Sequence, residues 1–230
     1  MKALAMLPTF NERGSAAELA RRLRALGLDV VVLDDASPDG TAQEAEGVEG
    51  VKVIRRRGPR GRGLAGREGY LYALEGGADF LVEMDADLSH RAEDVPKLLA
   101  AMDRCDVAVG SRRVPGGKDE ERGTLRRRLT ALSAAYARSV LGLPLEDPNS
   151  GFRCFSRRAL EAVEPATLRS SGPSIVHEVY WRAARAGLRM KEVPIEFLER
   201  KAGRSKLSLG RLAAGWLWVL RLRLDGWRPS

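Results

Sequence analysis

The fold is decided by residues 3–41, which read ALAMLPTFNERGSAAELARRLRALGLDVVVLDDASPDGT. Short apolar runs at 3–7 and 30–33 flank a segment, 16–26, in which apolar residues recur at helical spacing. A strand, a helix and a second strand in this order make a βαβ unit, which is typical of a parallel sheet.

The same alternation continues along the chain. Further apolar runs are found at residues 51–54, 80–84 and 107–109. Helical patterns are found at residues 41–45, 64–75, 93–102, 125–141, 176–186 and 207–224, and an extended segment at 190–198. The sequence therefore predicts an α/β fold, with a mostly parallel sheet and flanking helices. A length of 230 residues with 44% hydrophobic content suits one compact domain with a C-terminal appendage.

Polar residues gather where three of the predicted strands end. They form the segments 8–12 (PTFNE), 34–41 (DDASPDGT) and 85–87 (DAD). In an open α/β sheet, ligands bind in the crevice outside the carboxyl ends of the strands. The three segments therefore predict a ligand site at this edge of the sheet.

Asp85 and Asp87 are the candidate metal ligands. At strand spacing, residues i and i+2 point the same way, so both carboxylates could face one cation. Mg²⁺ is commonly held by one or two carboxylates together with substrate phosphates. The pair predicts a site for Mg²⁺ or Mn²⁺ that a nucleotide diphosphate completes. The alternative, two aspartates that cap a turn, stays open.

Asp34 and Asp35 are a second pair of carboxylates in need of partners. Burying both would be costly without hydrogen-bond donors. A base N–H or a ribose hydroxyl would supply such donors, whereas Ser37 or Asp39 could simply cap the next helix.

The chain contains two histidines, His90 and His177. We expect His90 to shape the loop after Asp87, and we do not expect His177 to form an acid–base pair with the adjacent Glu178, because neighbouring helix residues do not face each other.

Six motifs together resemble family 2 glycosyltransferases with the GT-A fold, and more closely their dolichol-phosphate mannose synthase branch. The resemblance covers about residues 1–210. The motifs, in chain order, are PTFNE (8–12), DDASPDGT (34–41), MDADLSH (84–90), GSR (110–112), DPNSGFR (147–153) and ERKAGRSK (199–206).

The resemblance implies a role for individual residues. The positions that hold the base and ribose of the donor are matched by Pro8, Phe10, Glu12, Leu33 and Asp35. The metal-binding positions are matched by Asp85 and Asp87, and Asp87 is counted among the catalytic residues. The arginines near the donor diphosphate and acceptor phosphate are matched by Arg112, Arg127 and Arg200, and the basic end of the last motif by Lys206. Phe10 replaces a commoner tyrosine, and Ser89 replaces a glutamine that supports the metal in some members.

The implied reaction is metal-dependent transfer of a hexose, with inversion, to a polyprenyl or dolichyl phosphate. GDP-mannose is the donor that the resemblance favours. A phosphate acceptor carries roughly −1.5 to −2 charge at neutral pH, so it needs no strong general base. Transfer from UDP-glucose, or to a soluble acceptor, stays open.

Two other functional classes fit less well. A sugar nucleotidyltransferase would be expected to have a glycine-rich loop after the first strand, and residues 8–13 contain no glycine. A non-enzymatic RNA-binding protein would fit the net charge of +8, but the aromatic content is 6% and no aromatic–basic interleaving is seen. We therefore expect no nucleic-acid partner.

The C-terminal segment is strongly basic. Residues 200–230 contain eight basic residues and one acidic residue, and tryptophans lie among the arginines of the predicted helix. We expect a glycosyltransferase domain at 1–206 and a basic amphipathic helix at 207–230 that lies on an anionic membrane surface. The alternative is that this helix packs on the protein's own core. With two cysteines and no signal-peptide pattern, we expect a cytoplasmic protein, peripheral on the inner face of the membrane.

Overall fold

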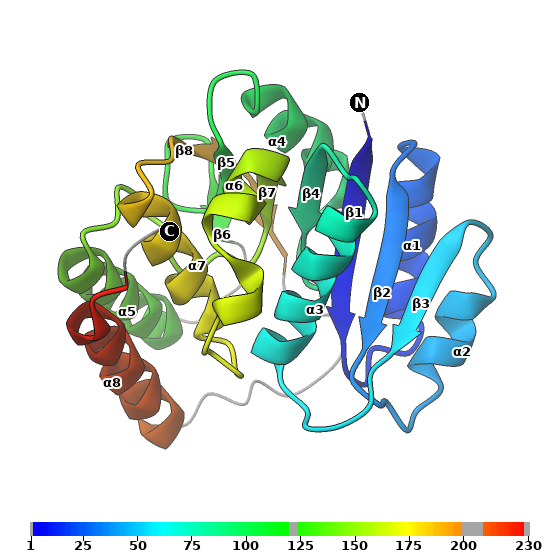
Figure 1. Ribbon diagram of the computed structural model, residues 1–230, viewed down its shortest axis with the longest axis horizontal. Helices are drawn as coiled ribbons and strands as arrows, with labels where there is room; N and C mark the ends of the chain where they lie inside the picture. Colours follow the sequence, from blue (N-terminus) through cyan, green and yellow to red (C-terminus); the bar gives the residue numbers. More distant parts are fainter. Residues whose placement is uncertain (1, 120–123, 199–208, 228–230) are drawn as a thin grey trace.

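The computed structural model describes residues 2–119, 124–198 and 209–227 of the chain (Figure 1). Its centre is a seven-stranded sheet with the strand order β3-β2-β1-β4-β7-β5-β8. These strands are β1 (Ala3–Thr9), β2 (Asp29–Asp34), β3 (Val51–Arg55), β4 (Phe80–Glu83), β5 (Val107–Ser111), β7 (Arg153–Ser156) and β8 (Met190–Pro194). Two short strands, β6 (Lys118–Asp119) and β9 (Glu196–Phe197), pair separately.

The sheet is mostly parallel, as predicted. β1 pairs in parallel with both β2 and β4, β2 with β3, and β5 with β8. β7 is the exception, because it runs antiparallel between β4 and β5. The sequence did not predict this strand. Its four residues follow a turn-rich loop directly and include a buried arginine, so they lack an apolar run that would mark a central strand.

Helices cover both faces of the sheet, and alternate residues of each strand enter two separate cores. Leu4 and Met6 of β1 join one core, whereas Ala5 and Leu7 join the other. The second core packs under α1 (Ser15–Ala25), α2 (Thr41–Glu46) and α4 (Val95–Ala101). The first core packs under α3 (Arg62–Glu75), α5 (Thr124–Leu141), α6 (Arg157–Ala162), α7 (Ile175–Arg185) and α8 (Leu209–Asp225). Burial on both faces explains why β1, β2 and β5 are nearly continuous apolar runs.

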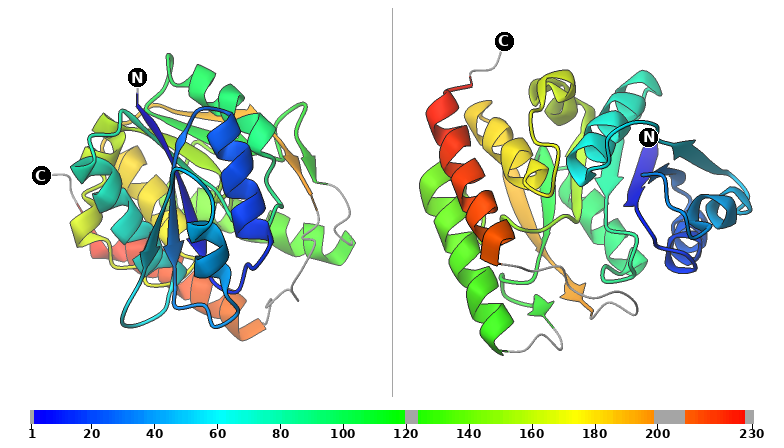
Figure 2. Two further views of the ribbon diagram at one scale, coloured as in Figure 1. Left: turned by 90° about the vertical axis from the view of Figure 1, so that its right-hand side faces the viewer. Right: turned by 90° about the horizontal axis from the view of Figure 1, so that it is seen from below.

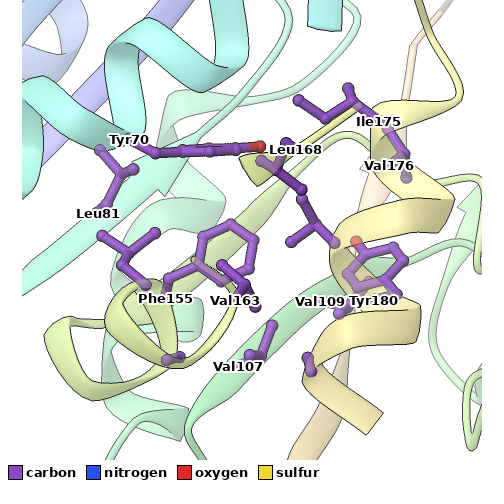
Figure 3. Packing of buried hydrophobic residues seen from close by; sticks show 14 of the residues in the cluster. Tyr70, Leu81, Val107, Val109, Phe155, Val163, Leu168, Ile175, Val176 and Tyr180 are labelled. Carbon is purple, nitrogen blue, oxygen red and sulfur yellow. The ribbon is translucent and has the colours of Figure 1, made fainter. Parts of the chain in front are cut away.

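The first core combines aliphatic side chains with the aromatic rings of Tyr70, Phe155 and Tyr180 (Figure 3). Tyr70 of α3 meets Phe155 of β7 edge to face, with ring centroids 5.9 Å apart. Tyr180 of α7 donates a hydrogen bond to the Ser150 carbonyl at 2.8 Å. This contact fixes the loop before β7 to the helix layer.

α8 packs along α5, and the two helices lie side by side (Figure 2). Val219 and Leu222 are buried in the first core. Trp218 Nε1 donates to Ser170 Oγ at 2.7 Å, and the Tyr136 hydroxyl of α5 donates to the Trp216 carbonyl at 3.0 Å. One face of the helix therefore packs on the protein itself.

The opposite face of α8 is exposed and apolar. Leu217, Leu220 and Leu224 are exposed, at 67%, 43% and 75% of their surface. They recur at i, i+3 and i+7, which places them on one side of the helix. Within residues 2–119, 124–198 and 209–227, no helix combines the length and the apolar character that crossing a bilayer requires.

Candidate active site

The three polar segments predicted to converge do so through hydrogen bonds between loops. The Asn11 amide donates to Ser37 Oγ and the Glu12 amide to Thr41 Oγ1, both at 3.0 Å, so the loops after β1 and β2 are tied together. The start of α3 links the segments 34–41 and 85–87. The Gly61 amide, just before the helix, donates to Asp35 Oδ2 at 2.6 Å, and Arg62, the first residue of the helix, contacts Asp85 in the loop after β4.

Asp85 and Asp87 lie on a bend beyond the end of β4, not on the strand itself. β4 ends at Glu83, and Leu88 has a positive φ of 63°, so alternation along a strand does not orient the two carboxylates. Local contacts orient them instead. Asp87 Oδ1 accepts from the Ser89 amide at 3.1 Å and from its hydroxyl, and Asp85 Oδ1 accepts from Arg62 Nη2 at 3.0 Å.

His90 shapes this loop, as expected. Its Nδ1 lies 3.3 Å from the Asp85 amide, and the neutral ring can accept that hydrogen bond. The ring packs against Phe152 and Phe197, with centroids 5.1 and 5.2 Å away. This burial lowers the pKa of His90, so the neutral form is favoured.

A buried network of ion pairs lies next to the loop that carries Asp85 and Asp87, and Arg62 connects the two. Glu83 Oε1 accepts from Arg62 Nη1 at 2.8 Å, and Oε2 accepts from Arg153 Nε at 2.8 Å and from the Tyr70 hydroxyl at 2.6 Å. Burial alone would raise the pKa of Glu83, but the two guanidinium groups outweigh it and hold the pKa below its usual range. Glu83 is therefore a charged anchor beneath the loop.

This network was not predicted from the sequence, although two charged residues in apolar surroundings indicate it. Glu83 stands inside the apolar run 80–84, and Arg153 stands between Phe152 and the strand residues Cys154 and Phe155. Two opposite charges in two buried strands would be expected to pair, because an unpaired buried charge is costly. β4 and β7 place Glu83 and Arg153 directly opposite each other.

The two aspartates fit a divalent cation that is bound together with phosphate. Among the described residues, no three His, Cys, Asp or Glu side chains are grouped so that they could hold a metal ion. Mg²⁺ nevertheless needs only one or two protein carboxylates when substrate phosphates and water complete its coordination shell. Asp85 is partly exposed and Asp87 is buried, so the pair reaches from the loop toward the surface.

Asp34 and Asp35 obtain their donors from the protein. Asp35 pairs with Arg56 and accepts from the Gly61 amide, and Asp34 Oδ2 accepts from the Ser37 amide at 3.0 Å. The need for donors is thus met within the chain, so it gives no separate support for a bound nucleotide. Pro8 and Leu33 lie on β1 and β2 next to each other in register.

Two further residues matched to the nucleotide positions lie after β1. The Arg60 guanidinium lies over the Phe10 ring at 4.9 Å from its centroid, and Glu12 Oε2 accepts from Ser15 Oγ at 3.3 Å. Arg60 therefore makes a cation–π contact with one face of the Phe10 ring.

Arg112 is held by the protein rather than projecting into solvent. Its Nε and Nη2 donate to the two oxygens of Asp147 at 2.7 and 2.9 Å, and its guanidinium lies over Phe197. The GSR and DPNSGFR motifs therefore meet in one ion pair. Arg127 belongs to α5, but its side chain lies outside the described residues, and so do Arg200 and Lys206.

His177 and Glu178 bind different partners, as expected of neighbours on a helix. His177 Nε2 lies 2.9 Å from Asn149 Oδ1, and burial lowers its pKa to about 4. Glu178 accepts from the Ser170 amide at 2.8 Å and pairs with Arg182. Both residues therefore support loops around the site.

Comparison with known proteins identifies the family. The glycosyl transferase family 2 model matches residues 5–163. An undecaprenyl-phosphate mannosyltransferase of Micrococcus luteus is 40% identical over 99% of this chain and 98% of its own length. A polyprenol monophosphomannose synthase of Mycolicibacterium smegmatis is 35% identical over 97% and 89%.

A solved structure shares the fold. Glucosyl-3-phosphoglycerate synthase from Mycobacterium tuberculosis superimposes with a TM-score of 0.71 at 20% identity, over 97% of this chain and 79% of that one. The α/β architecture is thus that of a GT-A glycosyltransferase. The chain belongs to glycosyl transferase family 2, in the dolichol-phosphate mannose synthase branch, and is a glycosyltransferase.

Proposed function

We propose that this enzyme transfers mannose from GDP-mannose to a polyprenyl phosphate, with inversion, using Mg²⁺ or Mn²⁺ at Asp85 and Asp87. The observation that carries the proposal is the match, along nearly the whole of both chains, to a relative named undecaprenyl-phosphate mannosyltransferase. The aspartate loop at the carboxyl end of β4 supports it, because it offers the carboxylates that a metal–diphosphate complex requires.

In this proposal the residues of the site divide the work. Asp35, Phe10 and their neighbours hold the nucleoside, and Asp85 and Asp87 hold the cation. A bound divalent cation would neutralise the negative charge that develops on the leaving diphosphate. Arg127, Arg200 and Lys206 bind the diphosphate and the acceptor phosphate; this role rests on the resemblance of their motifs.

Neither histidine is placed to act as a general base, which favours an acceptor that is already ionised. His90 uses its Nδ1 to accept from the Asp85 amide, and His177, with a pKa of about 4, is a weak base held by Asn149. Neither is available to deprotonate a sugar hydroxyl. A phosphate acceptor needs no such base, since it is largely dianionic at neutral pH.

We further propose that α8 places the enzyme on the anionic inner face of the cell membrane. Leu217, Leu220 and Leu224 form an exposed apolar face, and Arg221 and Arg223 are exposed on the same helix. Leucine with arginine is the composition of a helix that lies in the membrane interface. The reason for such a contact is that the acceptor's polyprenyl chain stays in the bilayer.

The test is a matrix of donors and acceptors. Purified enzyme is incubated with radiolabelled GDP-mannose or UDP-glucose, each with a polyprenyl phosphate or with soluble sugars and phosphates, and the products are identified by mass spectrometry. We expect mannosyl phosphoryl polyprenol from GDP-mannose and loss of product in EDTA. Transfer from UDP-glucose alone, or to soluble acceptors alone, would replace this function with the corresponding alternative.

A further inference from the structure

Arg62 joins the candidate metal loop to the buried network and is a residue to which the motifs assign no role. It is the first residue of α3, and its side chain is 21% exposed. Nη1 donates to Glu83 at 2.8 Å and Nη2 to Asp85 at 3.0 Å, so one guanidinium bridges two carboxylates. Glu83 is itself fixed by Arg153 and Tyr70. Arg62 thus connects Asp85 to a rigid anchor.

The backbone around Arg62 is held as firmly as its guanidinium. The Gly61 amide binds Asp35, and the Gly63 amide donates to the Ser171 carbonyl at 2.9 Å. A Cβ at Gly61 would lie 2.2 Å from that same carbonyl oxygen, so a side chain there would have to displace the backbone. These contacts leave little freedom for the start of α3 to move.

A third loop closes over the ion pair. A Cβ at position 151 would lie 2.9 Å from Arg62 Nη2 and 3.5 Å from Asp85 Oδ1. Glycine at this position therefore lets the loop of the DPNSGFR motif approach the pair closely. Arg62 and Asp85 lie between this loop and the buried Glu83, and both remain partly exposed.

The charges of this cluster balance before any ligand binds. Arg62 and Arg153 oppose Glu83 and Asp85, so these four groups together are neutral, and Asp87 in the same loop adds one negative charge. A divalent cation that binds Asp85 must share its carboxylate with Arg62 and is repelled by the guanidinium. A nucleoside diphosphate brings negative charge of its own and removes that penalty.

We propose that Arg62 is a positioning residue that makes metal binding depend on the donor: it holds Asp85 in place and opposes the free divalent cation until the nucleotide diphosphate arrives. The inference rests on the proposed metal site at Asp85 and Asp87. Its consequence is a positive coupling between the two ligands, each of which strengthens the binding of the other by the same factor.

The coupling can be measured without turnover. Mn²⁺ binding is followed by electron paramagnetic resonance, with and without GDP, for the wild type and for Arg62→Gln and Arg62→Lys. Arg67→Gln is the matched control, because it also removes one positive charge from α3, but further along the helix. We expect GDP to tighten Mn²⁺ binding to the wild type at least about fivefold.

Arg62→Gln should bind Mn²⁺ at least about threefold more tightly than the wild type in the absence of GDP, and GDP should then add less. Arg62→Lys, which keeps the charge, and the Arg67→Gln control should behave as the wild type. Glu83 retains Arg153 and Tyr70 in each variant, and thermal melts check the fold.

Three results would decide against this role for Arg62. In the first, Arg62→Gln binds Mn²⁺ no more tightly than the wild type does. In the second, GDP tightens Mn²⁺ binding to Arg62→Gln as much as it does for the wild type. In the third, GDP has no effect on Mn²⁺ binding to the wild type. The last needs no variant, so it decides even if Arg62→Gln does not fold. Failure of the wild type to bind Mn²⁺ even with GDP would instead overturn the proposed metal site.

Discussion

Arg112 and Asp147 form a bidentate ion pair in which the arginine side chain is 7% exposed and the carboxylate is fully buried. The pair joins β5 to the loop before β7. Asp147 is held further by its own amide, which donates to Glu192 Oε1 of β8 at 2.8 Å. The geometry gives Arg112 a structural partner within the protein.

Arg112→Ala should therefore destabilise the fold. It removes the bidentate partner of a buried carboxylate, which costs about 3–5 kcal/mol. Chemical denaturation measures the loss. Arg113→Ala is the control, because Arg113 is more exposed and its Nε lies 4.0 Å from Asp147; we expect a change of about 1 kcal/mol or less. An Arg112→Ala protein of wild-type stability that has lost activity would show that Arg112 acts on the substrate instead.

Asp85→Asn and Asp87→Asn should each lower turnover at least about 100-fold, because each removes a charge that would hold the metal–diphosphate complex. The fold should survive, since both residues lie on a loop beyond β4. Turnover is measured with GDP-mannose and polyprenyl phosphate, and circular dichroism checks the fold. Asp103→Asn, on an exposed turn, is the matched control. Full activity of either variant, or of the wild type in EDTA, would contradict the metal assignment.

Replacing Leu217, Leu220 and Leu224 together with serine should abolish binding to anionic liposomes. The three side chains are exposed, so their removal takes apolar surface from the membrane contact and leaves the core-facing Val219 and Leu222 in place. Co-sedimentation measures the binding, and high salt should release the wild type.

Leu26→Ser is the control for this membrane contact, because Leu26 is also exposed but follows α1. It should sediment with liposomes as the wild type does. If the triple serine variant sedimented equally well, the exposed face of α8 would not be the membrane contact.

His177 should make the protein less stable in acid. Folding lowers its pKa from 6.5 to about 4, so below pH 6.5 the unfolded chain binds a proton that the native protein does not. Stability therefore falls as the pH falls. His177→Gln can still donate to Asn149 and does not titrate. Between pH 7 and pH 5 the wild type should lose about 2 kcal/mol relative to this variant. Urea denaturation at both pH values measures this, and a constant difference would contradict the lowered pKa of His177.

The two ends of α1 show what a local sequence pattern can and cannot predict. Glycine is typical of the residue that follows a helix, and Gly27, with φ of 82°, follows the end of α1. Ser15 with Glu18 three residues later is the pattern of a capping box, which would make Ser15 the N-cap. In the structure Ser15 is instead the first helical residue, and its hydroxyl donates to the Glu12 carbonyl at 3.1 Å. The start of the helix depends on how the loop after β1 folds, and a local pattern does not contain that information.

Local patterns in the sequence were enough to predict the parallel βαβ framework and the edge of the sheet at which the candidate site lies. Apolar runs and helical spacing are local properties, and the polar segments at 8–12, 34–41 and 85–87 lie where strands end. Motif order along the chain was enough to identify the family, because it does not depend on how side chains pair.

Which charged residues face each other depends on the tertiary structure. Glu83 and Arg153 are 70 positions apart, and Arg112 and Asp147 are 35 apart. Their pairing requires β7 to insert antiparallel between β4 and β5. α8 likewise carries one face that packs on the core and one that is exposed. Helical spacing predicts two faces, but only the position of α5 and α7 beside it determines which leucines remain in solvent.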